Sequence, residues 1–482
     1  MIQTASQHKQ KTISSLKWSG INQVLKQSMN IGFGIMLARL LSPAEFGLIG
    51  MVTVITGFMQ LFNDFGFGSA LIHKLDANEL DYSSVFWFNL LTGFVFCSLL
   101  IISSPLIALF YKNSDLKIII ISVSFLFIIQ AFSYVQYVIL KKNLNFKGVF
   151  IAELIAITAS GSIAIYMAYH HYGVYSLVAQ TLLNSAILGV VIWVNSTWTP
   201  KFKYSMQSIK QLLKYSVPLM GSNALGYLLG NVDKILIGKY LGTLNLGIYT
   251  RAYSLMIFPV GQISGVISQV LFPSFALIQH DKEKIKSIYV KMNKTISFVT
   301  FPLMVMAFIL AEPFILVVLG PQWKEMIPIF KILTIVGALQ SVGTLVGNIF
   351  MALGEMKLYF KVNLFSGLVF ILASLIGIQF GIIGVSIAFL VATILISVPQ
   401  MHITGRLIDL KLKDYFNMFK TSSLQSFFLL IIFVLLSQLN LNIPNKGQLM
   451  LFPILALFIY MLSNFLWNKK LIFEIVNNFK KQ

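Results

Sequence analysis

The chain has 482 residues, of which 57% are hydrophobic and only 11% are charged, and its mean hydropathy is +0.81. A soluble domain of ordinary composition is about half apolar and about a quarter charged, so a water-soluble enzyme and a disordered chain are both excluded. The formal net charge is +20, and the positions of the basic residues decide whether it indicates nucleic acid or a membrane.

Long apolar runs follow one another along the whole chain. A helix needs about 20 residues to cross the hydrocarbon of a bilayer, so the sequence predicts an all-α membrane protein with about 14 transmembrane helices. The first run contains Lys26 and Arg39 and no cleavage site of small residues, which favours a retained helix over a signal peptide. The expected spans are 17–41, 45–73, 82–110, 116–140, 148–169, 173–194, 209–241, 246–279, 290–311, 326–353, 358–379, 381–405, 421–440 and 447–467.

Lys and Arg are distributed unevenly between the connecting loops. With the N-terminus inside and the chain alternating from span to span, most of the 36 Lys and Arg residues fall on the inner side. Such a bias is typical of cytoplasmic loops, so it predicts two cytoplasmic termini and needs no nucleic-acid partner. One loop departs from the pattern, because Lys74 is accompanied there by Asp76, Glu79 and Asp81.

The chain also repeats itself in order and at a nearly constant spacing. Residues 37–41, followed by Phe46-Gly47, match residues 237–241, followed by Leu246-Gly247. We therefore predict a six-helix bundle over 1–200, its repeat over 201–405, and two additional helices with a cytoplasmic tail over 406–482. Transporters with parallel repeats bind their substrate between the two halves and rock one half against the other.

Sequence motifs of enzymes are absent. There is no Gly-x-Ser-x-Gly, no phosphate-binding Gly-rich loop and no His-Glu-x-x-His in the sequence. His170 and His171 are adjacent, and adjacent side chains point about 100° apart on a helix, so they are poor metal ligands. We expect neither a catalytic residue, nor a metal, nor a cofactor.

Ionisable groups inside spans are the remaining candidates for function, since each is costly in the bilayer and usually faces a cavity or a partner. Asn22, Lys26 and Asn30 are spaced by four residues and form one polar stripe on the first helix. The stripe is either a polar seam between helices or a water-filled surface that faces substrate, and we favour the second.

A second group of charges lies at the helices that begin the two halves. Cations outnumber acids there, which gives a cavity a positive potential and favours an anionic substrate. Asp233 is either a proton- or sodium-coupling carboxylate or the partner of a neighbouring cation, and pairing is the preferred interpretation. Asp64 and Glu153, near the inner ends of their spans, are interface anchors or gating groups. The cations are Lys26, Arg39, Lys234, Lys239 and Arg251.

These residues are similar to those of a known family. Residues 40–47, Asn63-Asp64-Phe65-Gly66, and above all residues 231–234 with the segment through Arg251-Ala252-Tyr253 resemble the Wzx-type bacterial polysaccharide flippases. These flippases form part of the multidrug/oligosaccharidyl-lipid/polysaccharide exporter superfamily. The resemblance covers about residues 10–405, and Arg39, Asp233, Lys234, Lys239 and Arg251 fall on family positions, whereas Lys26 matches no family motif.

The resemblance implies a V-shaped pair of six-helix bundles around a central cavity in the bacterial inner membrane. It implies transport of an undecaprenyl-pyrophosphate-linked oligosaccharide, in cooperation with a polymerase and chain-length machinery. The alternatives are an ion-coupled multidrug exporter of the same superfamily and a membrane enzyme. The exporter is less favoured, because such proteins carry a cavity carboxylate in the first helix and this first helix has none.

Overall fold

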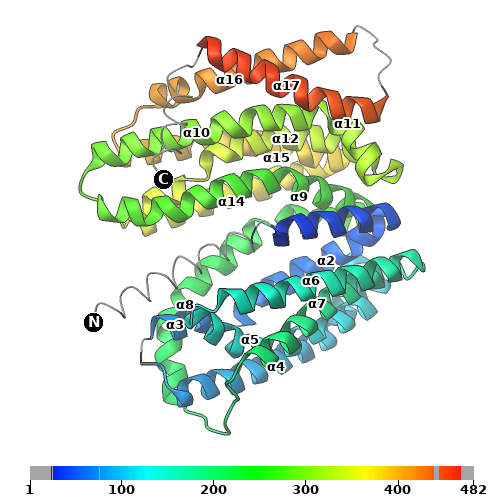
Figure 1. The fold of residues 1–482 in the computed structure, drawn as a ribbon, viewed down its shortest axis with the longest axis vertical. Helices are drawn as coiled ribbons and strands as arrows, with labels where there is room; N and C mark the ends of the chain where they lie inside the picture. Colours follow the sequence, from blue (N-terminus) through cyan, green and yellow to red (C-terminus); the bar gives the residue numbers. More distant parts are fainter. Residues whose placement is uncertain (1–22, 24, 64, 75, 439–443, 468–482) are drawn as a thin grey trace. The chain divides into compact units, whose positions relative to one another are not determined.

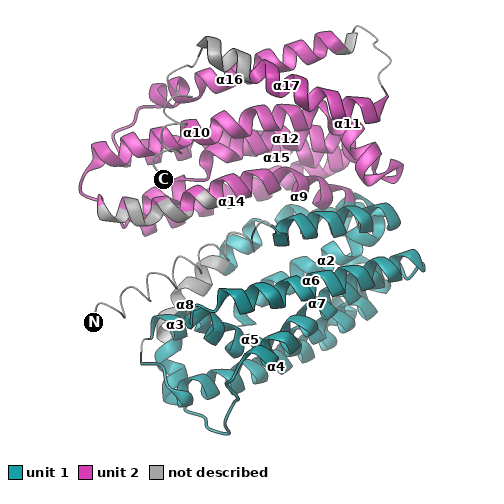
Figure 2. Ribbon diagram, in the orientation of Figure 1, with its two compact units in different colours: residues 1–247 teal, residues 248–482 magenta. Residues whose placement is uncertain are grey.

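The computed structural model describes residues 23, 25–63, 65–74, 76–438 and 444–467. Every regular element among these residues is helical (Figure 1), which confirms the all-α prediction. The chain divides into two compact units, residues 1–247 and 248–482 (Figure 2). The predicted repeat boundaries at residues 200 and 405 stay a prediction. The compact units are defined by helix packing, whereas the repeats are defined by sequence similarity, so one does not test the other.

The first unit begins with a helix over residues 25–40. Within the unit α4 packs on α5, α6 on α7, and α5 on α7. The labelled helices that follow the first one are α2 (Pro43–Asn63), α3 (Phe67–His73), α4 (Glu79–Tyr111), α5 (Asp115–Lys142), α6 (Phe146–Tyr169), α7 (Val174–Asn195), α8 (Met206–Leu229) and the beginning of α9 (Val232–Leu277).

The second unit holds the remainder of α9 and the helices after it. Here α14 packs on α15, and α10 packs on both α12 and α16. These helices are α10 (Lys282–Ile309), α11 (Ala311–Phe314), α12 (Met326–Gly343), α13 (Val346–Ala352), α14 (Met356–Gly377), α15 (Gly381–Leu407), α16 (Leu412–Gln438) and α17 (Asn445–Trp467). Short turns η1 (Ile315–Leu319), η2 (Pro321–Trp323) and η3 (Ile378–Phe380) connect some of them.

The helices carry large apolar side chains outward and small polar ones inward. On α4, Leu109 is 75% exposed whereas Ser104 is fully buried. In the second unit, the hydroxyl groups of Thr300 on α10 and Ser341 on α12 are 2.9 Å apart. Hydroxyl pairs and small residues hold helices together in a bilayer, where lipid tails are as apolar as leucine, so both units are built for a membrane.

Nine helical segments among the described residues are long and apolar enough to cross a membrane. One of them, Met356–Leu407, has 52 residues and contains both α14 and α15. The chain is therefore a multi-pass membrane protein, and the predicted number of about 14 spans is an approximate one.

Two predicted spans are interrupted in the structure. The span predicted over 45–73 divides into α2 and α3, and Phe65 (φ 48°) and Gly66 (φ 71°) between them adopt left-handed conformations that a helix cannot contain. The span predicted over 209–241 divides at residues 230–231, between α8 and α9. Gly242 (φ 81°) then forms a kink that divides α9 into two helical parts. Apolar runs do not reveal such breaks, because hydropathy is unchanged across them.

Candidate functional site

Lys26 of the first helix forms an ion pair with Glu153 of α6. The ammonium nitrogen lies 3.0 Å from Oε2 of the carboxylate, and the side chains are 41% and 9% exposed, respectively. The two residues are 127 positions apart. The structure therefore brings together Lys26, which the sequence predicts to bind substrate, and Glu153, which it predicts to act in gating.

Packing of the first helix on α6 explains this pairing. The ring of Phe33 lies against Gly161, where an added Cβ would be 2.6 Å from the ring. Further along both helices, Leu37 joins Ala164 and Ala168 in one buried cluster. Residue numbers increase together along the two helices, so the helices run in the same direction. The predicted topology requires this, because they correspond to its first and fifth spans, 17–41 and 148–169.

Tyr137 and Lys141 of α5 complete the surroundings of Glu153. The Tyr137 hydroxyl donates a hydrogen bond of 3.1 Å to Oε1 of Glu153. The Lys141 ammonium lies 4.3 Å from the centroid of the Tyr137 ring, a cation–π distance. Sequence reasoning missed both residues, although their spacing of four puts them on one face of a helix. We call Lys26, Tyr137, Lys141 and Glu153 the Lys26 cluster.

The other members of the predicted polar stripe are placed differently. Asn30 lies one turn after Lys26 and is exposed. Asn22 lies outside the described residues, and so does Asp64 of the predicted gating group. Arg39 is exposed in the last turn of the first helix.

Asp233 and Lys234 stand in the first turn of α9, directly after the break at residues 230–231. Asp233 is 8% exposed, and its carboxylate accepts a hydrogen bond of 2.8 Å from the backbone N–H of Lys234. The Lys234 ammonium donates to Oδ1 of Asn231 at 2.7 Å. The sequence predicted this pair in the outer half of one continuous span over 209–241. Its position at the start of α9 is a correction, and an acid there is stabilised by the helix dipole.

The two remaining predicted cations, Lys239 and Arg251, belong to different units of the chain. The Lys239 ammonium lies 4.0 Å from the centroid of the Phe110 ring, and therefore contacts an aromatic face of α4. Arg251 belongs to the second unit and is half-buried. Tyr249, two residues before Arg251, is fully buried and stacks on Tyr253 at 6.4 Å between ring centroids.

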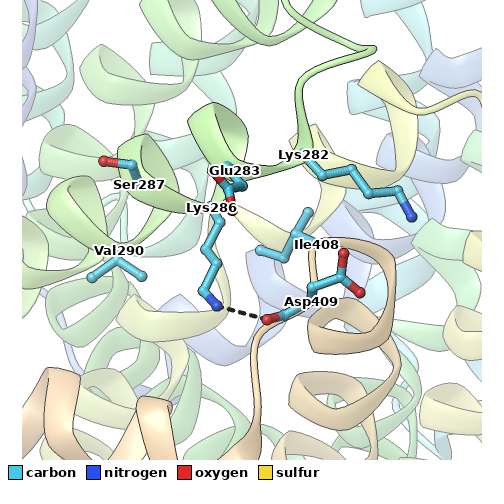
Figure 3. A pocket seen from close by; sticks show the side chains of 7 residues that line it. All are labelled: Lys282, Glu283, Lys286, Ser287, Val290, Ile408 and Asp409. Carbon is cyan, nitrogen blue, oxygen red and sulfur yellow. Dashed lines mark hydrogen bonds between the residues drawn. The ribbon is translucent and has the colours of Figure 1, made fainter.

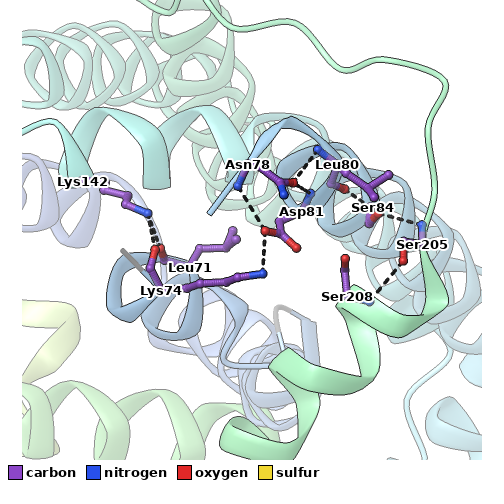
Figure 4. Close-up of polar contacts among 9 residues, drawn as sticks. All are labelled: Leu71, Lys74, Asn78, Leu80, Asp81, Ser84, Lys142, Ser205 and Ser208. Carbon is purple, nitrogen blue, oxygen red and sulfur yellow. Dashed lines mark hydrogen bonds and ion pairs between the residues drawn. The ribbon is translucent and has the colours of Figure 1, made fainter. Parts of the chain in front are cut away.

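The loop between α3 and α4 is the inner loop in which acids accompany the lysine. The charges of Lys74 and Asp81 neutralise each other there. The Lys74 ammonium lies 2.7 Å from Oδ2 of Asp81, whose side chain is 1% exposed (Figure 4). Asn78 caps α4 through the backbone N–H of Asp81. Lys142 of α5 donates to the carbonyl oxygens of Leu71 and Lys74 at 2.8 and 2.7 Å. Asp81 is therefore a structural counter-ion, which accounts for an acid among basic residues.

A hollow of about 450 Å³ opens at the beginning of α10 in the second unit (Figure 3). Lys282, Lys286, Glu283 and Asp409 contribute equal numbers of cations and acids to its lining. The Lys286 ammonium is already bonded to the carbonyl oxygen of Asp409 at 2.7 Å. Such a balanced lining does not select an anion, and we assign no ligand to it. Among the described residues no group of three potential ligands could hold a metal ion.

Long apolar helices in two units, with a small number of half-buried charges, define a multi-pass helical membrane protein. Residues 36–328 match the model of the family described as polysaccharide biosynthesis protein. The chain belongs to this polysaccharide biosynthesis protein family.

Two curated relatives illustrate the family. The chain is 28% identical to the lipopolysaccharide biosynthesis protein WzxC of Escherichia coli K12 over 80% of this chain and 79% of that protein. It is 29% identical to the teichuronic acid biosynthesis protein TuaB of Bacillus subtilis 168 over 72% of each.

Solved structures show the same fold at low sequence identity. The inward closed conformation of the lipid II flippase MurJ matches with a TM-score of 0.75 and 17% identity, over 95% of this chain and 100% of that one. An inward-facing multidrug resistance transporter of the MATE family matches with a TM-score of 0.64 and 16% identity, over 82% of this chain and 98% of that one.

Proposed function

We propose that this protein is a flippase that moves an undecaprenyl-pyrophosphate-linked oligosaccharide across the bacterial cytoplasmic membrane for the synthesis of a cell-surface polysaccharide. The observation that carries the proposal is the family match over residues 36–328 in a chain of apolar helices. It is supported by relatives named for lipopolysaccharide and teichuronic acid biosynthesis, and by a relative from Rhizobium meliloti named as a succinoglycan biosynthesis transport protein.

The chemistry required of such a transporter is recognition of a pyrophosphate and of sugar hydroxyls. We assign the pyrophosphate to cations, because ammonium and guanidinium groups form strong hydrogen bonds with phosphate oxygens. Asn22 and Asn30 lie four residues before and four residues after Lys26 in the sequence, and their amide groups suit sugar hydroxyls. The cations are Lys26, Arg39, Lys234, Lys239 and Arg251.

Release of the substrate on the outer side requires the two halves to alternate between inward and outward access. Asp233, Asp64 and Glu153 are the carboxylates that we assign to coupling or gating, with a proton or sodium ion as the driving ion. We place both termini in the cytoplasm from the excess of basic residues in the inner loops. A polysaccharide polymerase and its chain-length machinery are the protein partners that such a pathway needs, and no enzymatic step is assigned to this chain.

The test is depletion of the protein in its native host, followed by analysis of lipid-linked sugars in spheroplasts with an external glycan-binding probe. Complete repeat units that accumulate and cannot be reached from outside are the expected result. Truncated glycans would contradict the proposal and indicate an enzyme. An unchanged lipid pool would also contradict it, and increased sensitivity to cationic dyes would then favour a drug exporter.

A further inference from the structure

The Lys26 cluster joins three helices of the first unit through one carboxylate. Both oxygens of Glu153 are engaged, Oε2 by the Lys26 ammonium at 3.0 Å and Oε1 by the Tyr137 hydroxyl at 3.1 Å. A carboxylate held on both sides has a defined position, so it also defines the position of the lysine that it binds.

Exposure differs sharply between the two partners of this ion pair. Glu153 is buried, whereas two fifths of the Lys26 side chain is exposed. A lysine ammonium has three donor hydrogens, and the bond to Glu153 uses one. The exposed part of the Lys26 side chain therefore gives a second acceptor access to this residue while its ammonium rests on Glu153.

Lys141 adds a second positive charge to the same place. Its ammonium covers the Tyr137 ring and interacts electrostatically with both Glu153 and Lys26. Two ammonium groups share a single carboxylate in this cluster, which leaves one positive charge in excess. The repulsion between Lys26 and Lys141 is relieved when an anion arrives, and this favours anion binding.

From these contacts we infer that Glu153 is an exchangeable counter-ion of Lys26. In the substrate-free protein the carboxylate neutralises Lys26. When a phosphate oxygen of the substrate takes the Lys26 ammonium, the Glu153 carboxylate is released to Lys141, while Tyr137 continues to donate to it. Glu153 is thus a positioning residue that competes with the substrate, and this inference rests on the proposed pyrophosphate-linked substrate.

If the ion pair of Lys26 and Glu153 were purely structural, substitutions of the two residues would have different effects from those that counter-ion exchange predicts. A structural pair requires only that opposite charges meet, so either orientation of the charges would serve. Counter-ion exchange requires the cation to stand at position 26, on the exposed side, because that is where an anion can reach it. The two interpretations are therefore separable by substitution.

The experiment measures binding of farnesyl pyrophosphate to the full chain in lipid nanodiscs, with farnesol as the uncharged control ligand. Glu153→Gln removes the competing charge, and its amide oxygen still accepts from Tyr137. We expect this variant to bind farnesyl pyrophosphate about fivefold more tightly than the original chain, which corresponds to about 1 kcal/mol at 1.4 kcal/mol per tenfold. Lys26→Gln is expected to weaken binding, and farnesol binding is expected to be unchanged in both variants.

Glu79→Gln is the matched control. Glu79 forms another ion pair of the same unit, 3.9 Å from the Lys201 ammonium, and takes no part in the Lys26 cluster. This variant is expected to bind farnesyl pyrophosphate as the original chain does. Equal tightening in Glu79→Gln and Glu153→Gln would mean a general charge effect and would overturn the inference.

The double variant Lys26→Glu/Glu153→Lys tests the structural interpretation. We expect the reversed pair to recover part of the thermal stability lost in Lys26→Glu, because Lys141 repels a lysine at position 153. We expect it to recover neither farnesyl pyrophosphate binding nor polysaccharide export. Recovery of export would overturn counter-ion exchange. If the double variant does not fold, the Glu153→Gln binding measurement decides alone.

The outcomes also separate this inference from the proposed function. Equal or weaker binding by a folded Glu153→Gln variant overturns the exchange and leaves the flippase proposal intact. Failure of both the original chain and Glu153→Gln to bind farnesyl pyrophosphate overturns the exchange as well, and the spheroplast experiment then decides separately whether the chain is a flippase.

Discussion

Gly47 of α2 and Gly247 of α9 occupy corresponding positions in the sequence repeat, and their backbones pack against each other. A Cβ on Gly47 would collide with the carbonyl oxygen of Thr243, and one on Gly247 with the carbonyl oxygen of Pro43. Pro43 and Thr243 are themselves counterparts at the same spacing. The contact is therefore reciprocal, and it explains why glycine stands at both places.

Substitution of either glycine should lower stability. Gly47→Ala and Gly247→Ala each place a methyl group against a backbone carbonyl that cannot rotate away, and we expect a loss of about 1–3 kcal/mol. Thermal unfolding in detergent measures it. Gly226→Ala in α8 is the control, because among the described residues no atom outside the adjoining helix backbone lies within 4 Å of its added Cβ. Unfolding temperatures of Gly47→Ala and Gly247→Ala that equal those of Gly226→Ala would show that the packing is not tight.

Asp81→Asn should destabilise the first unit through the loop between α3 and α4. The buried carboxylate accepts from the Lys74 ammonium and from the backbone N–H of Asn78, and loss of its charge removes the ion pair with Lys74. We expect a cost of about 2–3 kcal/mol, measured as a decrease in thermal stability. Asp76→Asn, at an exposed position in the same loop, should change little. A larger effect at Asp76 than at Asp81 would contradict the assignment.

Arg251→Ala tests the assignment of a cation in the second unit to the substrate. We expect export of polysaccharide to fall about tenfold or more, since the loss of a charged hydrogen bond costs about 1.5–3 kcal/mol. The measurement is surface polysaccharide in a depleted host that expresses the variant, at matched protein levels in the membrane. Arg406→Ala, an exposed arginine at the end of α15, is the control. Full export by Arg251→Ala would remove Arg251 from the substrate site.

The contact between Lys239 and Phe110 should be measurable as a coupling between α9 and α4. Lys239→Gln, Phe110→Leu and the double variant form a thermodynamic cycle. We expect an interaction energy of about 0.5–1 kcal/mol, typical of a half-exposed cation–π pair. An interaction energy of zero in the unfolding measurements would show that Lys239 does not depend on the ring for its position.

The class of the protein was predictable from the sequence because hydropathy is a sum over many residues. Apolar runs of about 20 residues specify membrane helices whatever their neighbours are. The repeat was visible in the same way, through matches such as Phe46-Gly47 and Leu246-Gly247. The family followed from the segment around Asp233 and Arg251, and the model match over residues 36–328 confirms it.

Helix breaks and side-chain partners were not predictable in this way. The interruption at Phe65-Gly66 depends on two backbone angles that leave the hydropathy unchanged. The ion pair of Lys26 with Glu153 joins helices 127 positions apart, and no local spacing rule connects such distant residues.

The sequence by itself thus determined the membrane class, the family and the kinds of charge available for function. Only the tertiary structure decided which charges meet, because a buried carboxylate takes whichever donors the packed helices bring within about 3 Å. For Glu153 those donors come from the first helix and from α5. Lys26, which the sequence predicts to bind substrate, is therefore already paired with Glu153. Glu153 is the first residue to test by substitution.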